Sequence, residues 1–256
     1  MNKYFILTTA LLIKITAFGI GNPLAPGLET DPIFNCCENL AFKGGYRGCF
    51  VYNRKMHTDQ SPINNFSIFS NEGVLSLNFA HQAEFYIYAG SNNMALETTN
   101  GVESLVMNFN TNFIAGFGAT SILYQWHCYN IGRGALSLTG QYEDSSWTGT
   151  NSVIINAQNE PGRTAFRYRE GTVSLSAGQQ IGYLVPYIGL NWSAARVRVR
   201  EDLTQGATEL GAIIRNSRSF GFSMGVSLVD AARMMVTAEL RIMNESGMSI
   251  NADFHF

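Results

Sequence analysis

Charged residues are scarce in this chain: Asp, Glu, Lys and Arg make up 14% of its 256 residues, against roughly 25% in an ordinary soluble domain. Long apolar runs are lacking too, and beyond the N-terminal segment none approaches the roughly 20 residues that a membrane helix needs. So little charge indicates a surface that largely faces something other than water. If such a chain enters a membrane, it enters as a barrel, because only helices and closed barrels satisfy their backbone groups in lipid.

A basic field is also missing. The formal net charge is −2 and the isoelectric point is about 6.1, so no overall positive potential attracts a phosphate backbone. Nucleic acid is therefore excluded as a partner. No linker rich in proline, serine or charge divides the chain, and we interpret it as one domain.

The most regular feature is an alternation of apolar and small polar residues near the C-terminus. It covers residues 217–229, 233–242 and 248–256. In the first of these segments Phe220, Phe222 and Met224 alternate with glycine and serine. Side chains of a strand point to opposite faces in turn, so each segment predicts a strand with one apolar and one polar face.

Similar segments recur from Leu40 onwards, and together they predict about ten strands, with a range of 8 to 12. A soluble β-sandwich would alternate as well, but its polar face would carry Lys, Glu and Thr, whereas here Gly, Ser and Asn dominate. Aromatic residues gather at strand ends, where the girdles of membrane barrels lie; they are Tyr52, Tyr142, Trp192 and Phe256. We therefore predict an all-β fold, a transmembrane antiparallel up-and-down β-barrel over residues 40–256.

The N-terminus is typical of an exported protein. A short basic start precedes the apolar residues Tyr4 to Ile13, and small residues follow, so residues 1–21 predict a signal peptide cleaved near 17–21. A buried N-terminal helix is the alternative. Residues 22–39 hold three of the six prolines and show no periodicity, and we expect a periplasmic arm there.

Two stretches interrupt the regular pattern. Phe166 and Tyr168 are even-numbered while the apolar residues after Gly171 are odd-numbered, so a bulge at Gly171 is predicted. Arg196, Arg198 and Arg200 continue the parity of the apolar residues before them. Either the strand has left the bilayer by Arg196, or a second bulge turns the arginines inward. The polar residues 143–163 predict the longest loop, on the extracellular side.

Isolated charges fall on the polar faces, and we predict that they point into the lumen. They are Lys43, Arg47, Arg133, Glu239, Arg241, Asp253 and His255. If they line water, their mixed signs predict weak charge selectivity, since selectivity comes from rings of one sign. Alternatively, Arg241 and Glu239 pair with Asp253 and Arg133 and plug a narrow lumen.

No catalytic, cofactor or metal site is predicted. Residues 221–225 match the G-x-S-x-G pattern of serine hydrolases, but that motif needs a strand-turn-helix elbow, and here it lies within an alternating strand. The histidines are scattered, with no metal-binding spacing; they are His57, His81, His127 and His255.

The four cysteines are disulfide candidates: Cys36, Cys37, Cys49 and Cys128. Adjacent cysteines are poorly placed to bond each other, so in an oxidising periplasm Cys36 and Cys37 would take other partners. Bonds to Cys49, to Cys128 or to a neighbouring molecule are all open, because connectivity cannot be read from sequence.

Several segments resemble the chlamydial major outer membrane protein family of porins. They are GNPLAPGLE at 21–29, LNFAHQAEFYIYAGS at 77–91, the region 117–137 with its Trp-x-Cys, VPYIGLNWSAAR at 185–196, and the tail 219–256. Membership implies a Gram-negative outer membrane, a homotrimeric general porin and a shell cross-linked to other envelope proteins by disulfides. It also implies that Phe254 and the terminal Phe256 form the signal for the barrel-insertion machinery. The chain is shorter than this family, and poorer in cysteine.

Two functions of different class follow. The first is a porin that lets small hydrophilic solutes diffuse across the outer membrane, contributes to envelope structure through disulfides and performs no catalysis. The second is a non-conducting structural or surface barrel, acting through its disulfides and the loops near Trp147 and Gln205. An outer-membrane hydrolase with a histidine at the rim ranks third.

Overall fold

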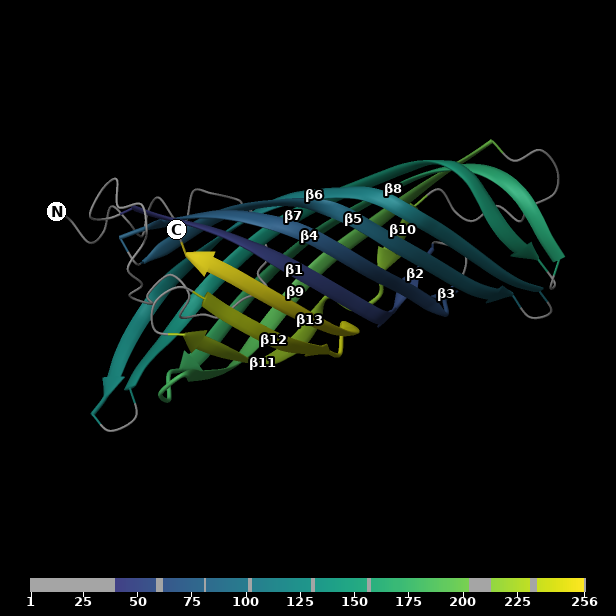
Figure 1. Ribbon diagram of the computed structural model, residues 1–256. Coiled ribbons are helices and arrows are strands. Elements are labelled where there is room, and N and C mark those ends of the chain that lie inside the picture. Colours follow the sequence, from purple (N-terminus) through teal and green to yellow (C-terminus); the bar gives the residue numbers. More distant parts are fainter. Residues whose placement is uncertain are drawn as a thin grey trace, which may run out of the picture.

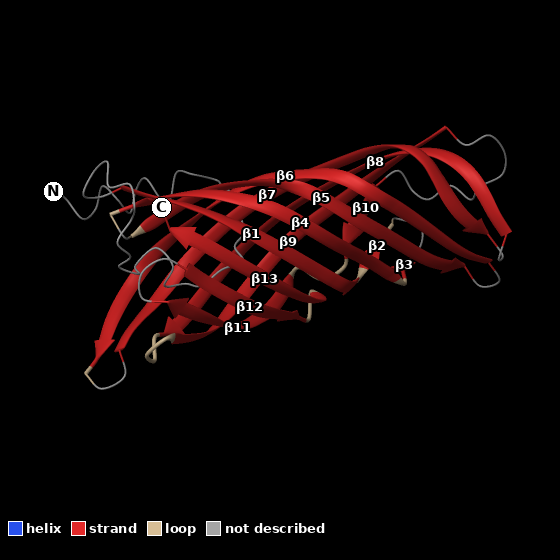
Figure 2. Cartoon of the chain, viewed as in Figure 1, coloured by secondary structure: helices blue, strands red, loops and turns tan. Residues whose placement is uncertain are grey.

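A computed structural model describes residues 40–58, 62–80, 82–100, 103–129, 132–155, 158–202, 213–230 and 234–255. The predicted signal peptide and arm, with Cys36 and Cys37, lie outside these ranges, as do His81, Gln205 and Phe256. What is described consists of strands and their connections (Figure 2). No helix long and apolar enough to cross a membrane occurs within it.

The described part of the chain forms one 13-stranded sheet. Ten strands are long and three are short. The strands are β1 (Leu40–Arg54), β2 (Met56–His57), β3 (Pro62–Ile63), β4 (Asn65–Phe79), β5 (Ala83–Asn100), β6 (Glu103–Cys128), β7 (Gly132–Ile155), β8 (Gln158–Gln179), β9 (Leu184–Asp202), β10 (Ile213–Asn216), β11 (Phe220–Asp230), β12 (Met234–Ile242) and β13 (Glu245–His255).

The ten long strands close into a ring. Each pairs antiparallel with the next along the chain, β13 returns to β1, and the direct pairing of β9 with β11 bypasses the short strands β10, β2 and β3 at one rim. Figure 1 shows the strands strongly tilted, with the hairpin of β6 and β7 extending furthest at one end and β5 to β9 extending furthest at the other. The predicted up-and-down barrel of about ten strands is confirmed.

The two ends of the barrel differ in their connections. One end holds Leu40, His255 and the short connections 80–82, 129–131, 180–183 and 231–233, and we call it the turn end. The other, the loop end, holds the short strands and the connection between β9 and β11. Outer-membrane barrels have short periplasmic turns and longer extracellular loops, so the loop end is the extracellular one.

Over the middle of the barrel the outer face is apolar and the inner face polar. Exposed on the outside are Leu75, Phe85, Ile87, Phe117, Leu138, Leu175, Ile188, Leu190, Phe222, Met224, Leu240 and Ile250. Buried on the inside are Ser76, Asn78, Ser137, Thr139, Gln141, Ser174, Ser176, Asn191, Ser223, Ser227, Thr237 and Ser249. Lipid solvates the outer set of side chains, and polar partners in the lumen satisfy the inner set. This arrangement is that of a transmembrane barrel.

Glycines on the inner face make room for inward tyrosines. A Cβ at Gly116 would lie 2.3 Å from the ring of Tyr88, and one at Gly225 would lie 2.4 Å from the ring of Tyr187. The ring of a tyrosine on one strand thus covers a glycine on the next. This packing explains why glycine, rather than alanine, occupies these inward positions.

The bulge predicted at Gly171 is wrong. β8 pairs with both neighbouring strands through Gly171 without a shift in register. Tyr142 of β7 faces Gly171 on one side, and Ala194 of β9 faces it on the other. Phe166 and Tyr168 therefore point inward, where they are fully buried. What changes at Gly171 is the chemistry of the faces: towards the loop end the inside becomes apolar and the outside polar.

The same inversion of the two faces explains the position of Arg196 and Arg198 on β9. Its register with β8 is continuous, so Val197 is buried inside while Arg196 and Arg198 stay on the outer face. No second bulge turns them inward. The predicted loop at 143–163 is also wrong, because β7 and β8 remain paired as far as Ile155 and Gln158.

Candidate functional site

The predicted inward charges divide into two groups. Lys43, Arg47 and Glu239 are buried in the barrel and Arg241 is nearly so. Asp253 is half-buried on β13, and Arg133 is exposed at the turn end of β7. The side chain of His255 lies outside the described part. The buried group belongs to a larger set of polar side chains that crosses the lumen.

Arg47 of β1 is the first centre of this set. It forms an ion pair with Glu72 on β4, and its Nε donates to Glu72 Oε2 at 2.7 Å. Its Nη1 donates to Gln141 Oε1 of β7 at 2.9 Å, and its guanidinium lies 3.9 Å from the ring centre of Tyr88. Because β7 lies four strands from β1 around the ring, Arg47 reaches almost across the barrel.

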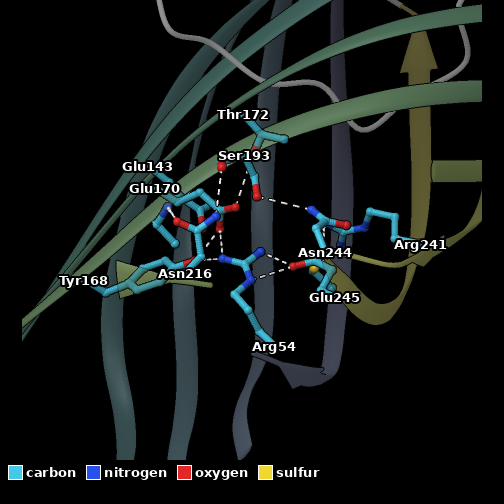
Figure 3. A network of polar contacts seen from close by, with 12 residues as sticks. Arg54, Glu143, Tyr168, Glu170, Thr172, Ser193, Asn216, Arg241, Asn244 and Glu245 are labelled. Atoms are coloured by element: carbon cyan, nitrogen blue, oxygen red, sulfur yellow. Dashed lines mark hydrogen bonds and ion pairs between the residues drawn. The ribbon is translucent and has the colours of Figure 1, made fainter. Parts of the chain in front are cut away.

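Arg54, near the loop end of β1, is the second centre (Figure 3). Its Nη1 lies 2.6 Å from Glu170 Oε2 and donates to the Tyr168 hydroxyl at 2.6 Å. Its Nε donates to Glu245 Oε2 of β13 at 2.8 Å. A bulge between Val51 and Asn53 makes this possible, because the shifted register turns Arg54 inward.

Arg241 of β12 completes the set. Its Nη1 lies 2.5 Å from Glu245 Oε1, and its Nη2 donates to Cys49 Sγ at 2.8 Å. Glu239 accepts a hydrogen bond from the Tyr187 hydroxyl at 2.8 Å. We call the whole set the central network: Arg47, Arg54, Glu72, Gln141, Glu143, Glu170, Glu239, Arg241 and Glu245.

The central network leaves little free space. The cavity among its side chains has a volume of about 40 Å³, enough for one or two water molecules. Five carboxylates, from Glu72, Glu143, Glu170, Glu239 and Glu245, face three guanidiniums, from Arg47, Arg54 and Arg241. The network is therefore formally acidic.

An apolar layer covers the network on its loop side. Phe109 and Phe166 pack there with ring centres 4.5 Å apart, and Phe66 packs against Tyr168 at 5.8 Å. The full layer consists of Cys49, Val51, Met56, Ile63, Phe66, Ile68, Met94, Leu96, Phe109, Phe166, Tyr168, Ala195, Val197 and Ile214. A smaller apolar cluster of Ala135, Val185, Val229 and Met235 lies inside the turn end.

Most acidic members of the network were not predicted as site residues. Glu143 lies in the predicted loop at 143–163, Glu245 lies between the segments 233–242 and 248–256 that predict strands, and Glu170 lies beside the predicted bulge. Glu72 was not singled out. Arg54 was not among the predicted inward charges either. For the four glutamates the signal that would have found them is continuous strand parity: each occupies an inward position of a strand that extends beyond the apolar belt. Arg54 follows a bulge and breaks that parity, so the pattern of β1 would have placed it outward.

The two described cysteines lie in different parts of the barrel. Cys49 is buried beside Arg241 inside the barrel, whereas Cys128 is half-buried at the turn end of β6, and both are free thiols. Ser223 of the G-x-S-x-G match lies within β11, with its side chain buried in the lumen. Among the described residues no three metal-ligating side chains come together.

Known proteins similar to this chain are outer-membrane proteins. No family model matches it. The major outer membrane porin of Chlamydia abortus is 19% identical to it over 97% of both chains, and that of Chlamydia pneumoniae is 19% identical over 95% of both. The chain is a distant relative of these chlamydial porins. Together with the apolar outer face, this relationship places it in the outer membrane.

Solved barrels resemble it only in outline. The translocator domain of the autotransporter NalP from Neisseria meningitidis is 8% identical over 91% of each chain, with a TM-score of 0.44. The outer membrane protease OmpT from Escherichia coli is 11% identical over 85% of this chain and 92% of its own, with a TM-score of 0.37.

Proposed function

We propose that the chain is an outer-membrane channel of the porin type, through which small hydrophilic solutes diffuse without a catalytic step. The observation that carries this proposal is the central network, a set of buried charges that spans the lumen between Arg47, Arg54 and Arg241. The relationship to proteins named as porins supports it.

Buried charges are costly to a structure that does not use them. Ion pairs such as Arg54 with Glu170 and Glu245 lose hydration on burial, and apolar side chains of similar volume often give equal or greater stability. A barrel with a purely structural role would be as stable with an apolar interior. Retaining the eight charged side chains of the central network is therefore better explained by a path for polar solutes.

On this proposal the described residues adopt a closed conformation of the channel. Between the network and the extracellular side lies the apolar layer, in which Phe109, Phe166 and Phe66 are buried. Conduction requires this layer to separate, for example by movement of the loop-end segments of β6 and β8. The surplus of carboxylates predicts that the open channel weakly prefers cations.

A non-conducting structural barrel is the second candidate, and the small cavity and apolar layer favour it. In that case the network would serve only to hold β1 against β8 and β13. Planar-bilayer recording of the refolded chain separates the two functions. Discrete openings support the channel, and their absence from both the native chain and variants of the apolar layer would refute it.

We also propose that the chain contributes to the structure of the envelope through disulfides. Cys128 lies at the periplasmic end and is partly exposed, so it can reach another molecule, while Cys49 inside the barrel cannot. Cross-links would then use Cys128 together with Cys36 or Cys37. A homotrimer, and insertion machinery that reads Phe254 and Phe256, are proposed from the family resemblance alone.

A further inference from the structure

Five arginines lie together on the outer face of the barrel, just beyond the apolar belt on the loop side. We call them the arginine belt: Arg167 and Arg169 on β8, Arg196 and Arg198 on β9, and Arg215 on β10. None of them takes part in the central network. They all point away from the lumen, because Phe166, Tyr168, Val197 and Ile214 occupy the inward positions between them.

Strand pairing brings these charges into direct opposition. Arg196 faces Arg169 on one side and Arg215 on the other, so three guanidiniums form a row across three neighbouring strands. Arg198 faces Arg167 in the next row. Cβ atoms of directly opposed residues lie about 4.5–5.5 Å apart, and like charges in such pairs are destabilising.

Few carboxylates of the described residues neutralise the positive charge of the arginine belt. Asp144 of β7 is the one carboxylate that pairs with the belt within the described residues, and it lies 2.7 Å from Arg167 and 3.0 Å from Arg169. Arg196, Arg198 and Arg215 have no described acidic partner. The Nε–H of Arg196 is buried and donates a hydrogen bond to no described acceptor. An external anion would satisfy both the charge and this donor.

The position of the belt indicates where that anion comes from. Trp192, which pairs with Val173 and Phe220, ends the apolar outer face of this sector. Arg196 follows four residues later, or about 13 Å along the strand. Given the usual tilt of 35–45°, this is the depth of lipid headgroups in the extracellular leaflet.

We propose that the arginine belt binds the phosphate groups of a phosphorylated glycolipid of the lipid A type in the outer leaflet. Arginine suits this role because its planar guanidinium donates two parallel hydrogen bonds to phosphate. The acyl chains of the same lipid would lie on the apolar face around Trp192 and Phe220. This site is independent of conduction through the lumen.

The test uses the full chain refolded in a neutral detergent. Its probes are bisphosphorylated lipid A, the same lipid with both phosphates removed, and inorganic phosphate, with binding counted by native mass spectrometry. We expect lipid A to bind at least ~10-fold more tightly than its dephosphorylated form, since each nearby arginine contributes about fivefold. High salt should weaken this preference.

Variants locate the site. Arg196→Gln should weaken lipid A binding about fivefold, and the triple variant Arg196→Gln/Arg198→Gln/Arg215→Gln on the order of 100-fold. Arg133→Gln, which removes an exposed arginine at the opposite end, should leave binding unchanged. Gel mobility before and after boiling verifies that each variant is folded; should the triple variant not fold, the comparison of Arg196→Gln with Arg133→Gln decides.

Three results would overturn the proposal. Equal affinity for lipid A and its dephosphorylated form would show that the phosphates are not recognised. Unchanged binding to the folded Arg196→Gln and triple variants would place the lipid elsewhere. Displacement of lipid A by millimolar inorganic phosphate would show a site for free anions rather than for a lipid headgroup.

Discussion

Arg54 and Glu170 meet across the full width of the barrel, with Arg54 Nη1 2.6 Å from Glu170 Oε2. Their strands, β1 and β8, are five strands apart in either direction around the ring. A single ion pair thus joins opposite walls of the lumen. The same ion pair therefore stabilises the barrel and obstructs its lumen.

Replacing Arg54 by alanine should strongly destabilise the barrel. Glu170 and Glu245 would then lose their shared partner while they remain buried, and such a loss costs about 3–5 kcal/mol. Unfolding in urea, followed by tryptophan fluorescence in detergent or vesicles, measures the change. The matched control is Arg167→Ala, which removes an exposed arginine paired with Asp144 on the outer face. An equally small effect of both substitutions would show that the pair across the lumen does not stabilise the barrel.

Phe109→Ala and Phe166→Ala should open the apolar layer. Each phenylalanine is buried against the other, and such a truncation costs about 3–5 kcal/mol through the cavity it leaves. The unfolding free energy should fall accordingly, while entry of a small neutral sugar into proteoliposomes should accelerate. Phe117→Ala serves as the control, because Phe117 is 52% exposed on the lipid face. Unchanged uptake in the double variant would show that this layer does not restrict the lumen.

The two described thiols should differ in their reactivity. A large, membrane-impermeant maleimide should label Cys128 in the folded barrel but leave Cys49 untouched, because Cys49 is buried beside Arg241. In denaturant both thiols should react. Peptide mapping by mass spectrometry, in a chain with Cys36→Ser and Cys37→Ser, gives the comparison. Rapid labelling of Cys49 in the folded protein would contradict its placement inside the closed lumen.

Deleting Phe254, His255 and Phe256 should impair assembly in the outer membrane. The deletion shortens β13, where Phe254 faces Gly44 of β1 and Met234 of β12 at the seam that closes the ring. Cell-surface labelling and the shift in gel mobility on boiling report on assembly. A substitution of the exposed Phe85 by alanine tests for a general loss of apolar surface. Normal surface display of the truncated chain would refute the role of this terminus.

The sequence was sufficient to predict the part of the barrel that lies in lipid. Phe222, Met224 and Val226 alternate with small polar residues because one face meets acyl chains and the other a polar interior. That contrast has a period of two and is visible without a structure. It yields the all-β class, the antiparallel barrel and the approximate number of strands.

Beyond the lipid the same parity carries the opposite chemistry, and there the predictions failed. Phe166 and Tyr168 turn inward to an apolar layer while Arg167 and Arg169 face out, so an unbroken strand looks like a change of register. The segment 143–163 is rich in Ser, Thr, Asn and Gly, and its extended form depends on pairing of β7 with β8 and of β6 with β7, which joins residues far apart in the sequence. Contacts such as Arg54 with Glu170 join residues 116 positions apart, and no local pattern encodes them.

Planar-bilayer recording tests the proposed function most directly. For the native chain we expect infrequent, discrete openings with a weak preference for cations, because the network carries five carboxylates against three guanidiniums. The Phe109→Ala/Phe166→Ala variant should open far more often, and Phe117→Ala should behave as the native chain does. Absence of openings from the native chain and the double variant alike, in protein shown to be folded, would contradict the channel and leave the structural barrel.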